Sequence, residues 1–238
     1  MTQLLSFHSD PTLKAEYVAR VKAHAEADEI VKGQYWQNGK GCAVGCTIHS
    51  GTHAAYETIL GLPEWLARLE DTLFENLPNR KAKLFPGRFL EAIPVGVNLE
   101  RIKWKFCAFI LAENIERALL LKISDELKEQ VVSAIRGILV LHEKAVIDGI
   151  WDESAARSAR SAAWSAESAA WSAGSAARSA AWSARSARSA AWSAESAAWS
   201  AAWSAGSAES AESAAWSAGS AAYTRYAEKL IELLKDAK

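Results

Sequence analysis

Two cysteines and two histidines lie within the twelve residues from Cys42 to His53, with the spacing C-x3-C-x2-H-x3-H. Thiolate sulfur and imidazole nitrogen are the ligands that tetrahedral zinc prefers, so Cys42, Cys46, His49 and His53 are candidate metal ligands. The spacing is not that of a zinc finger, in which a longer stretch separates the Cys and His pairs. Zinc is therefore the cofactor that these residue types suggest.

Four residues at this spacing on one helix would share a single face, and one straight face cannot surround an ion. Two of them would need a ligand from elsewhere, such as His8, His24 or Glu57. Two other interpretations stay open. In the first, the cysteines are buried structural residues with surface histidines beside them. In the second, one cysteine is a redox or nucleophilic centre.

A second candidate site is the turn Gly39-Lys40-Gly41, directly before the cysteine pair. Backbone N–H groups at such a turn, with a lysine beside them, can hold an anion or a phosphate group. Gly39, Lys40 and Gly41, with His49 and His53 nearby, are therefore candidate ligand-binding residues. The segment is not a Walker A loop, which requires Gly-x4-Gly-Lys-Ser/Thr. A purely structural turn is the alternative.

The elements that would position these residues are predicted to be helices, and the fold class is all-α. Asp10-Pro11 predicts a helix to about Lys32, and Pro63-Glu64 opens a second. Residues 79–98 are predicted to be mostly loop around a short turn at 89–92. Two longer helices are expected at about 99–121 and 124–148, and no segment shows convincing strand alternation.

Residues 154–223 are written in one repeated tile, Ser-Ala-x or Ser-Ala-Ala-x. Its twenty serines recur at a mean spacing of about 3.5 residues, which is a helical period. We therefore expect three parts. These are a compact N-terminal helical domain over 1–150, repeat helices over 151–222, and a C-terminal amphipathic helix over 223–238. The repeat helices would pack on themselves or form a coiled coil with a second copy.

The variable positions of the tile are filled in a sorted way. Every glutamate and glycine ends a three-residue tile, and every tryptophan ends a four-residue tile. On a helical wheel the tryptophans border the serine stripe and the charges lie opposite it. This sorting predicts an interface formed by Trp164, Trp171, Trp182, Trp192, Trp199, Trp203 and Trp216.

The composition restricts the classes of partner that the protein is expected to bind. A formal net charge of −1 gives no overall attraction to nucleic acid or anionic lipid. Arginines alternate with tryptophans in the tile, as in proteins that stack bases, but the interleaved glutamates argue against nucleic acid. Three cysteines are too few for a disulfide scaffold, and no long uncharged apolar stretch indicates a membrane span. We expect a cytoplasmic protein.

The N-terminal part contains the motifs LLSFHSDP, NGKGCAVGCT, LGLPEWLARLED and RFLEAIPVG. In these motifs the chain resembles a family of uncharacterised bacterial and phage proteins that end in an alanine-rich helical tail. The likeness covers the first hundred residues, and the tail in style only. It implies a bacterial or phage accessory protein, and it carries no activity or catalytic residues.

Three functions follow from these patterns. The leading one is a non-enzymatic binding or assembly protein whose repeat helices contact a protein partner or a second copy. The alternative is a protein that binds or sequesters a small anionic ligand or nucleotide at the segment Gly39–Cys46. The third is a metal- or thiol-dependent enzyme, although no set of catalytic residues can be assigned from the sequence.

Overall fold

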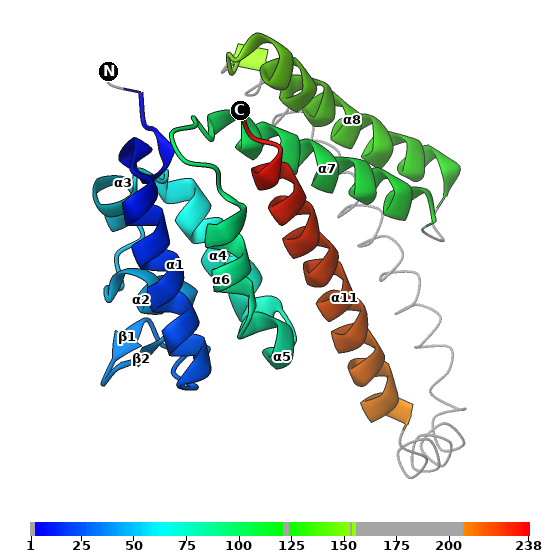
Figure 1. The fold of residues 1–238 in the computed structure, drawn as a ribbon. Helices are drawn as coiled ribbons and strands as arrows, with labels where there is room; N and C mark the ends of the chain where they lie inside the picture. Colours follow the sequence, from blue (N-terminus) through cyan, green and yellow to red (C-terminus); the bar gives the residue numbers. More distant parts are fainter. Residues whose placement is uncertain (1–2, 121–123, 153, 156–206) are drawn as a thin grey trace. The chain divides into compact units, whose positions relative to one another are not determined.

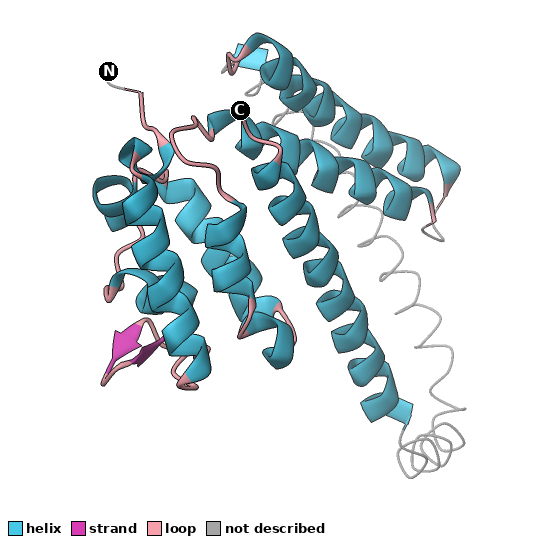
Figure 2. Cartoon of the chain, in the orientation of Figure 1, coloured by secondary structure: helices cyan, strands magenta, loops and turns pink. Residues whose placement is uncertain are grey.

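The computed structural model describes residues 3–120, 124–152, 154–155 and 207–238, with the backbone alone for residues 127 and 207–220. Helices dominate these residues, and the one sheet among them has two strands (Figure 2). The protein is therefore mostly all-α, as the sequence predicts. No helix in the described ranges is long and apolar enough to cross a membrane.

The chain divides into two units, Met1–Cys107 with Ala218–Lys238, and Ala108–Ser217. The first unit holds the short elements that follow one another from the N-terminus (Figure 1). They are a 3-10 turn at Ser6–Ser9, α1 (Pro11–Glu26), β1 (Trp36–Gln37), β2 (Lys40–Gly41), α2 (Ala43–Ile48), α3 (Ala55–Leu60), α4 (Glu64–Asn76), α5 (Asn79–Ala82) and α6 (Phe85–Ala92).

Helix α1 begins as predicted and ends earlier. The Asp10 side chain accepts a hydrogen bond from the backbone N–H of Thr12 at 2.7 Å, and Pro11 occupies the first turn. These are an N-cap and a first-turn proline. The helix stops at Glu26 rather than near Lys32, because Asp28 adopts a left-handed conformation with φ of 58°.

Helix α2 is the centre of the first unit. All six of its residues are buried, and it packs against α1, α3, α4 and α6. Such a short helix has little stability of its own, so the surrounding helices must hold it. The largest buried side chains of the unit include Phe7, Tyr56, Phe74, Phe85 and Phe89.

The prediction of a loop over residues 79–98 is wrong for most of its first half. Two short helices, α5 and α6, occupy residues 79–82 and 85–92. Pro86 lies in the first turn of α6, where a missing N–H costs nothing, so the Pro-Gly pair does not break this helix. The prediction of no strands also missed the small hairpin β1–β2.

The remaining helices are long. Helix α7 covers Glu100–Leu119, α8 covers Asp125–Asp148 and α11 covers Ser207–Lys235. Two of these lie close to the ranges expected from the sequence. The third, α11, begins inside the repeat and continues into the ordinary amphipathic C-terminus. Residues 156–206, which carry six of the seven repeat tryptophans, lie outside the described part of the chain.

The C-terminal part of α11 belongs to the first unit. Its buried residues are Ala222, Ala227, Leu230, Ile231 and Leu234. Arg88 of α6 forms two hydrogen bonds with the Glu228 carboxylate, at 2.8 and 2.7 Å. The amphipathic pattern of the last sixteen residues thus has a partner surface within the unit formed by the first hundred residues.

Candidate functional site

The hairpin lies against α2 because two glycines leave room for it. A Cβ atom on Gly41 or on Gly45 would overlap with the backbone carbonyl oxygen of Tyr35. The backbone N–H of Cys42 donates to the carbonyl oxygens of Gln34 and Tyr35 at 2.6 and 3.1 Å. These contacts are backbone to backbone, so any side chain at position 45 would force the two segments apart.

The turn of the hairpin is Asn38-Gly39, in which both residues have positive φ, 53° and 79°. This is the turn that an Asn-Gly pair favours between two antiparallel strands. Lys40 follows it and is exposed. The predicted ligand site at Gly39, Lys40 and Gly41 is therefore part of a hairpin. Gly39 is required by the turn, and Gly41 by the close approach of the Tyr35 backbone. Anion binding by this segment stays a prediction.

The four predicted metal ligands do not share one helix face. Helix α2 ends at Ile48, and His49 adopts a left-handed conformation with φ of 52°, so the histidines do not continue the face of the cysteines. Among the described residues, no group of three or more His, Cys, Asp or Glu side chains is arranged to hold a metal ion. The proposal of one site containing Cys42, Cys46, His49 and His53 thus has no geometric support.

Both cysteines of this segment are buried thiols. Burial is the main cause that raises the pKa of Cys46 to about 12, and it raises the pKa of Cys42 still further. The Cys46 Sγ donates to the Gly41 carbonyl oxygen at 3.2 Å. Because the thiolate is the nucleophile and the metal ligand, these environments disfavour both roles. The geometry agrees best with the structural interpretation of the two cysteines.

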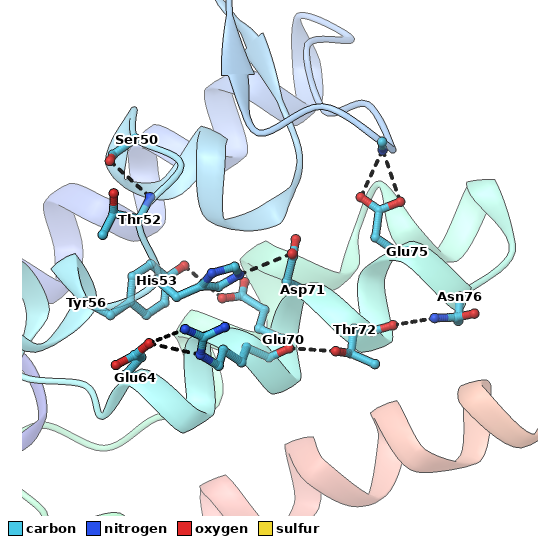
Figure 3. Close-up of polar contacts among 12 residues, drawn as sticks. Ser50, Thr52, His53, Tyr56, Glu64, Glu70, Asp71, Thr72, Glu75 and Asn76 are labelled. Carbon is cyan, nitrogen blue, oxygen red and sulfur yellow. Dashed lines mark hydrogen bonds and ion pairs between the residues drawn. The ribbon is translucent and has the colours of Figure 1, made fainter.

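A polar network joins His53 and Tyr56 to two acidic residues of α4 (Figure 3). The Tyr56 hydroxyl donates to Glu70 Oε2 at 2.8 Å, and His53 Nε2 is 3.2 Å from Asp71 Oδ2. Glu70 is fully buried, and this burial raises its pKa to about 8. Glu70 Oε1 and Asp71 Oδ1 are buried and have no hydrogen-bond partner among the described residues. Buried polar atoms without partners lower the stability of the folded state. Because Glu70 has a raised pKa, we expect the contribution of this network to stability to depend on pH.

A second histidine cluster was not foreseen. His24 Nε2 and His49 Nε2 are 2.8 Å apart, and His24 Nδ1 is 2.5 Å from Glu29 Oε2. The Trp36 indole stacks on the His49 ring with centroids 4.1 Å apart. Burial, followed by the charge of Arg20, lowers the pKa of His49. His24 was named in the sequence only as one of several extra ligands, because its contact with His49 spans 25 residues.

An open cleft of about 450 Å³ lies on another side of the segment that joins α1 to the hairpin. Its walls come from that segment, from the end of α4 and from α5. The lining residues are Asp28, Ile30, Val31, Lys32, Phe74, Asn79, Arg80, Ala82 and Lys83. Three cationic side chains and one acidic side chain therefore surround an apolar floor. This volume is within the range of about 300–1,000 Å³ that is typical of small-molecule sites.

The charged groups of the cleft differ in how well they are already satisfied. Lys83 Nζ is 2.7 Å from Asp28 Oδ1, and Lys32 Nζ donates to the Leu77 carbonyl oxygen. Burial lowers the pKa of Lys32. The guanidinium of Arg80 has no hydrogen-bond or ion-pair partner within the part of the chain that the structure describes. Arg80 is exposed, so its guanidinium is accessible to a ligand.

The residues of the cleft gave only a weak sequence signal. Arg80 and Lys83 are three residues apart in the basic run Asn79–Lys83, which directly follows Pro78. The sequence places that run in a predicted loop. The other wall of the cleft is about fifty residues earlier in the chain. The cleft could therefore be found only from the tertiary structure.

A scan against protein-family models found no match, and searches of curated proteins and of solved structures found no significant similarity. The resemblance to bacterial and phage proteins stays a prediction from the sequence.

Proposed function

We propose that the N-terminal unit binds a small anionic ligand in the cleft bordered by Lys32, Arg80 and Lys83. The observation that carries this proposal is the Arg80 guanidinium, which has no partner among the described residues and borders a 450 Å³ cleft with an apolar floor. The class of function is the alternative that the sequence suggested, a protein that binds a small anion. The location differs from the Gly39–Cys46 segment.

The chemistry of the cleft indicates what such a ligand looks like. A guanidinium is a planar fork that binds a carboxylate or a phosphate through two parallel hydrogen bonds. The floor formed by Ile30, Val31 and Phe74 favours an apolar or planar portion attached to the anionic group. A nucleotide or an aromatic carboxylate combines both features, whereas inorganic phosphate satisfies only the first.

The charge balance supports an anion rather than a cation. Lys83 is already close to Asp28, but an ammonium carries three donors and can contact a ligand without losing its carboxylate partner. Glu75 lies near the cleft, and its two carboxylate oxygens accept from the backbone N–H of Gly33 at 3.0 and 3.1 Å (Figure 3). This carboxylate is therefore engaged and does not compete for Arg80.

A thermal-shift panel with the full chain tests the proposal. Inorganic phosphate, citrate, AMP and ATP are added at low ionic strength, and a ligand that binds the folded state raises the melting temperature. Lys83→Gln should reduce the shift. Lys81→Gln, two residues earlier on α5 and outside the cleft lining, should leave it unchanged. An equal reduction in both variants would indicate non-specific attraction to surface charge.

A second proposal concerns the repeat. We propose that the Ser/Ala/Trp helices mediate assembly with a second copy or a protein partner. Two observations support it, the sorting of the tryptophans onto four-residue tiles and the helical backbone of α11 from Ser207 onward. Analytical ultracentrifugation of wild type, Ser193→Leu and the control Glu195→Gln tests it. Dissociation should occur in the serine variant alone, because a leucine there would hold close-packed helices apart.

A further inference from the structure

The two imidazole rings of His24 and His49 face each other through the same type of atom. Their Nε2 atoms are 2.8 Å apart, and the ring planes are inclined by 79°. Only one proton can occupy the space between two ring nitrogens at this distance. When that proton is absent, the Nε2 lone pairs of both rings therefore point toward the same place.

Glu29 fixes the orientation of the pair. Its carboxylate only accepts hydrogen bonds when ionised, so His24 Nδ1, 2.5 Å from Oε2, carries a proton. The His24 lone pair is then on Nε2 and points at His49. A carboxylate on the far nitrogen is the usual arrangement of histidines that bind a metal, because it sets the tautomer and the direction of the ring.

The spacing is close to that of two ligands on one zinc ion. Zinc–nitrogen bonds of about 2.0–2.1 Å at a tetrahedral angle place two nitrogens about 3.3 Å apart, so an opening of about half an ångström would admit the ion. His49 can make such an adjustment because it is exposed and follows the end of α2. Trp36 stacks on its ring, with an interplanar angle of 15°, and restrains the direction of the movement.

We propose that His24 and His49 bind a divalent transition-metal ion such as Zn²⁺ through their Nε2 atoms. Glu29 acts through His24 as a positioning residue. Because no third His, Cys, Asp or Glu of the described chain joins the pair, water or an external ligand fills the other positions. Neither histidine lines the anion cleft. His49 belongs to the metal set suggested by the sequence, and His24 is one of the extra ligands named there.

Nearby charge is compatible with a cation at this point. Arg20 is the positively charged residue that acts most strongly on His49. Its guanidinium already has protein partners. It contacts Glu16 at 2.9 Å and the Thr47 carbonyl oxygen at 3.2 Å, and it lies over the Tyr17 ring. The Glu29 carboxylate supplies the opposite charge on the other side of the pair.

Calorimetric titration of the full chain with Zn²⁺, in a buffer that does not coordinate metals, tests this proposal. We expect wild type to bind one equivalent at this site, and His24→Gln and His49→Gln each to weaken binding at least about tenfold. Glu29→Gln should weaken it by a smaller factor, and His53→Gln should leave it unchanged. Absence of zinc binding by wild type, or loss in His53→Gln but not in His24→Gln, would overturn the proposal.

A measurement on the wild type alone guards against variants that fail to fold. Cobalt(II) bound by nitrogen and oxygen ligands gives weak visible bands, whereas a thiolate ligand adds an intense charge-transfer band in the near ultraviolet. We expect the Co²⁺ complex to lack that band. Its presence would place the metal on Cys42 or Cys46 and exclude the two-histidine site.

Discussion

Glu70 should make the stability of the N-terminal unit fall as pH rises toward neutrality. Its side chain is fully buried on α4. One carboxyl oxygen accepts from Tyr56, and the other has no partner in the described part of the chain. Burial raises the pKa of this carboxyl from 4.5 to about 8. The folded protein therefore keeps Glu70 neutral at pH values where the unfolded chain ionises it.

The size of the effect follows from proton linkage. A carboxyl whose pKa is raised on folding stabilises the folded state most below its unfolded pKa, and that contribution is lost as pH rises from there to the folded pKa. With values of 4.5 and about 8, the free energy of unfolding should fall by about 2–3 kcal/mol between pH 5 and pH 7. Above about pH 8 the contribution stops changing.

Glu70→Gln isolates this term, because glutamine has nearly the same shape and does not ionise. Urea unfolding of wild type and variant at pH 5, 6, 7 and 8 measures it. The variant should gain about 2–3 kcal/mol relative to wild type between pH 5 and pH 7. Glu26→Gln, at an exposed position on α1, should stay parallel to wild type. Parallel curves for Glu70→Gln as well would show that Glu70 is ionised in the folded protein, and would refute the reasoning.

Two further predictions concern backbone packing and thiol reactivity. Gly45→Ala should lower the free energy of unfolding by at least about 2 kcal/mol, because its Cβ would overlap with the Tyr35 backbone. Gly137→Ala, whose Cβ meets nothing within 4 Å on α8, should be neutral or stabilising by up to about 1 kcal/mol in thermal melts. The buried cysteines at positions 42 and 46 should react with a thiol reagent far more slowly in the native protein than in denaturant, where all three thiols should react at once. Fast labelling of both in the native state would contradict their burial.

The sequence predicts well those elements whose signals are local. The Asp10-Pro11 start of α1 and the Pro63-Glu64 start of α4 are capping features that act within one turn. The bounds of α7 and α8 lie within a few residues of those predicted. The hairpin was not predicted, although Asn38-Gly39 is a typical hairpin turn. Its strands have only two residues each and are too short to show alternation.

The candidate sites were harder to predict because their contacts are not local. The residue types of Cys42, Cys46, His49 and His53 suggest a metal site, but their spacing does not show where the backbone turns between them. The left-handed backbone at His49 ends that helix, and His49 meets a residue of α1 instead. The cleft similarly joins residues 28–32 to residues 74–83. No periodicity or motif in one segment can reveal which other segment it will face.

The central claim is that the cleft binds an anion through Arg80, and calorimetric titration of matched variants tests it most directly. The ligand with the largest thermal shift in the panel is titrated into wild type, Arg80→Gln and Arg101→Gln, an exposed arginine on α7 of the same unit. Loss of one charge-assisted contact, at about 1.5–3 kcal/mol, should weaken binding about 10- to 100-fold in Arg80→Gln. Binding by Arg101→Gln should match wild type. Equal affinities for wild type and Arg80→Gln, with both proteins folded, would contradict the claim.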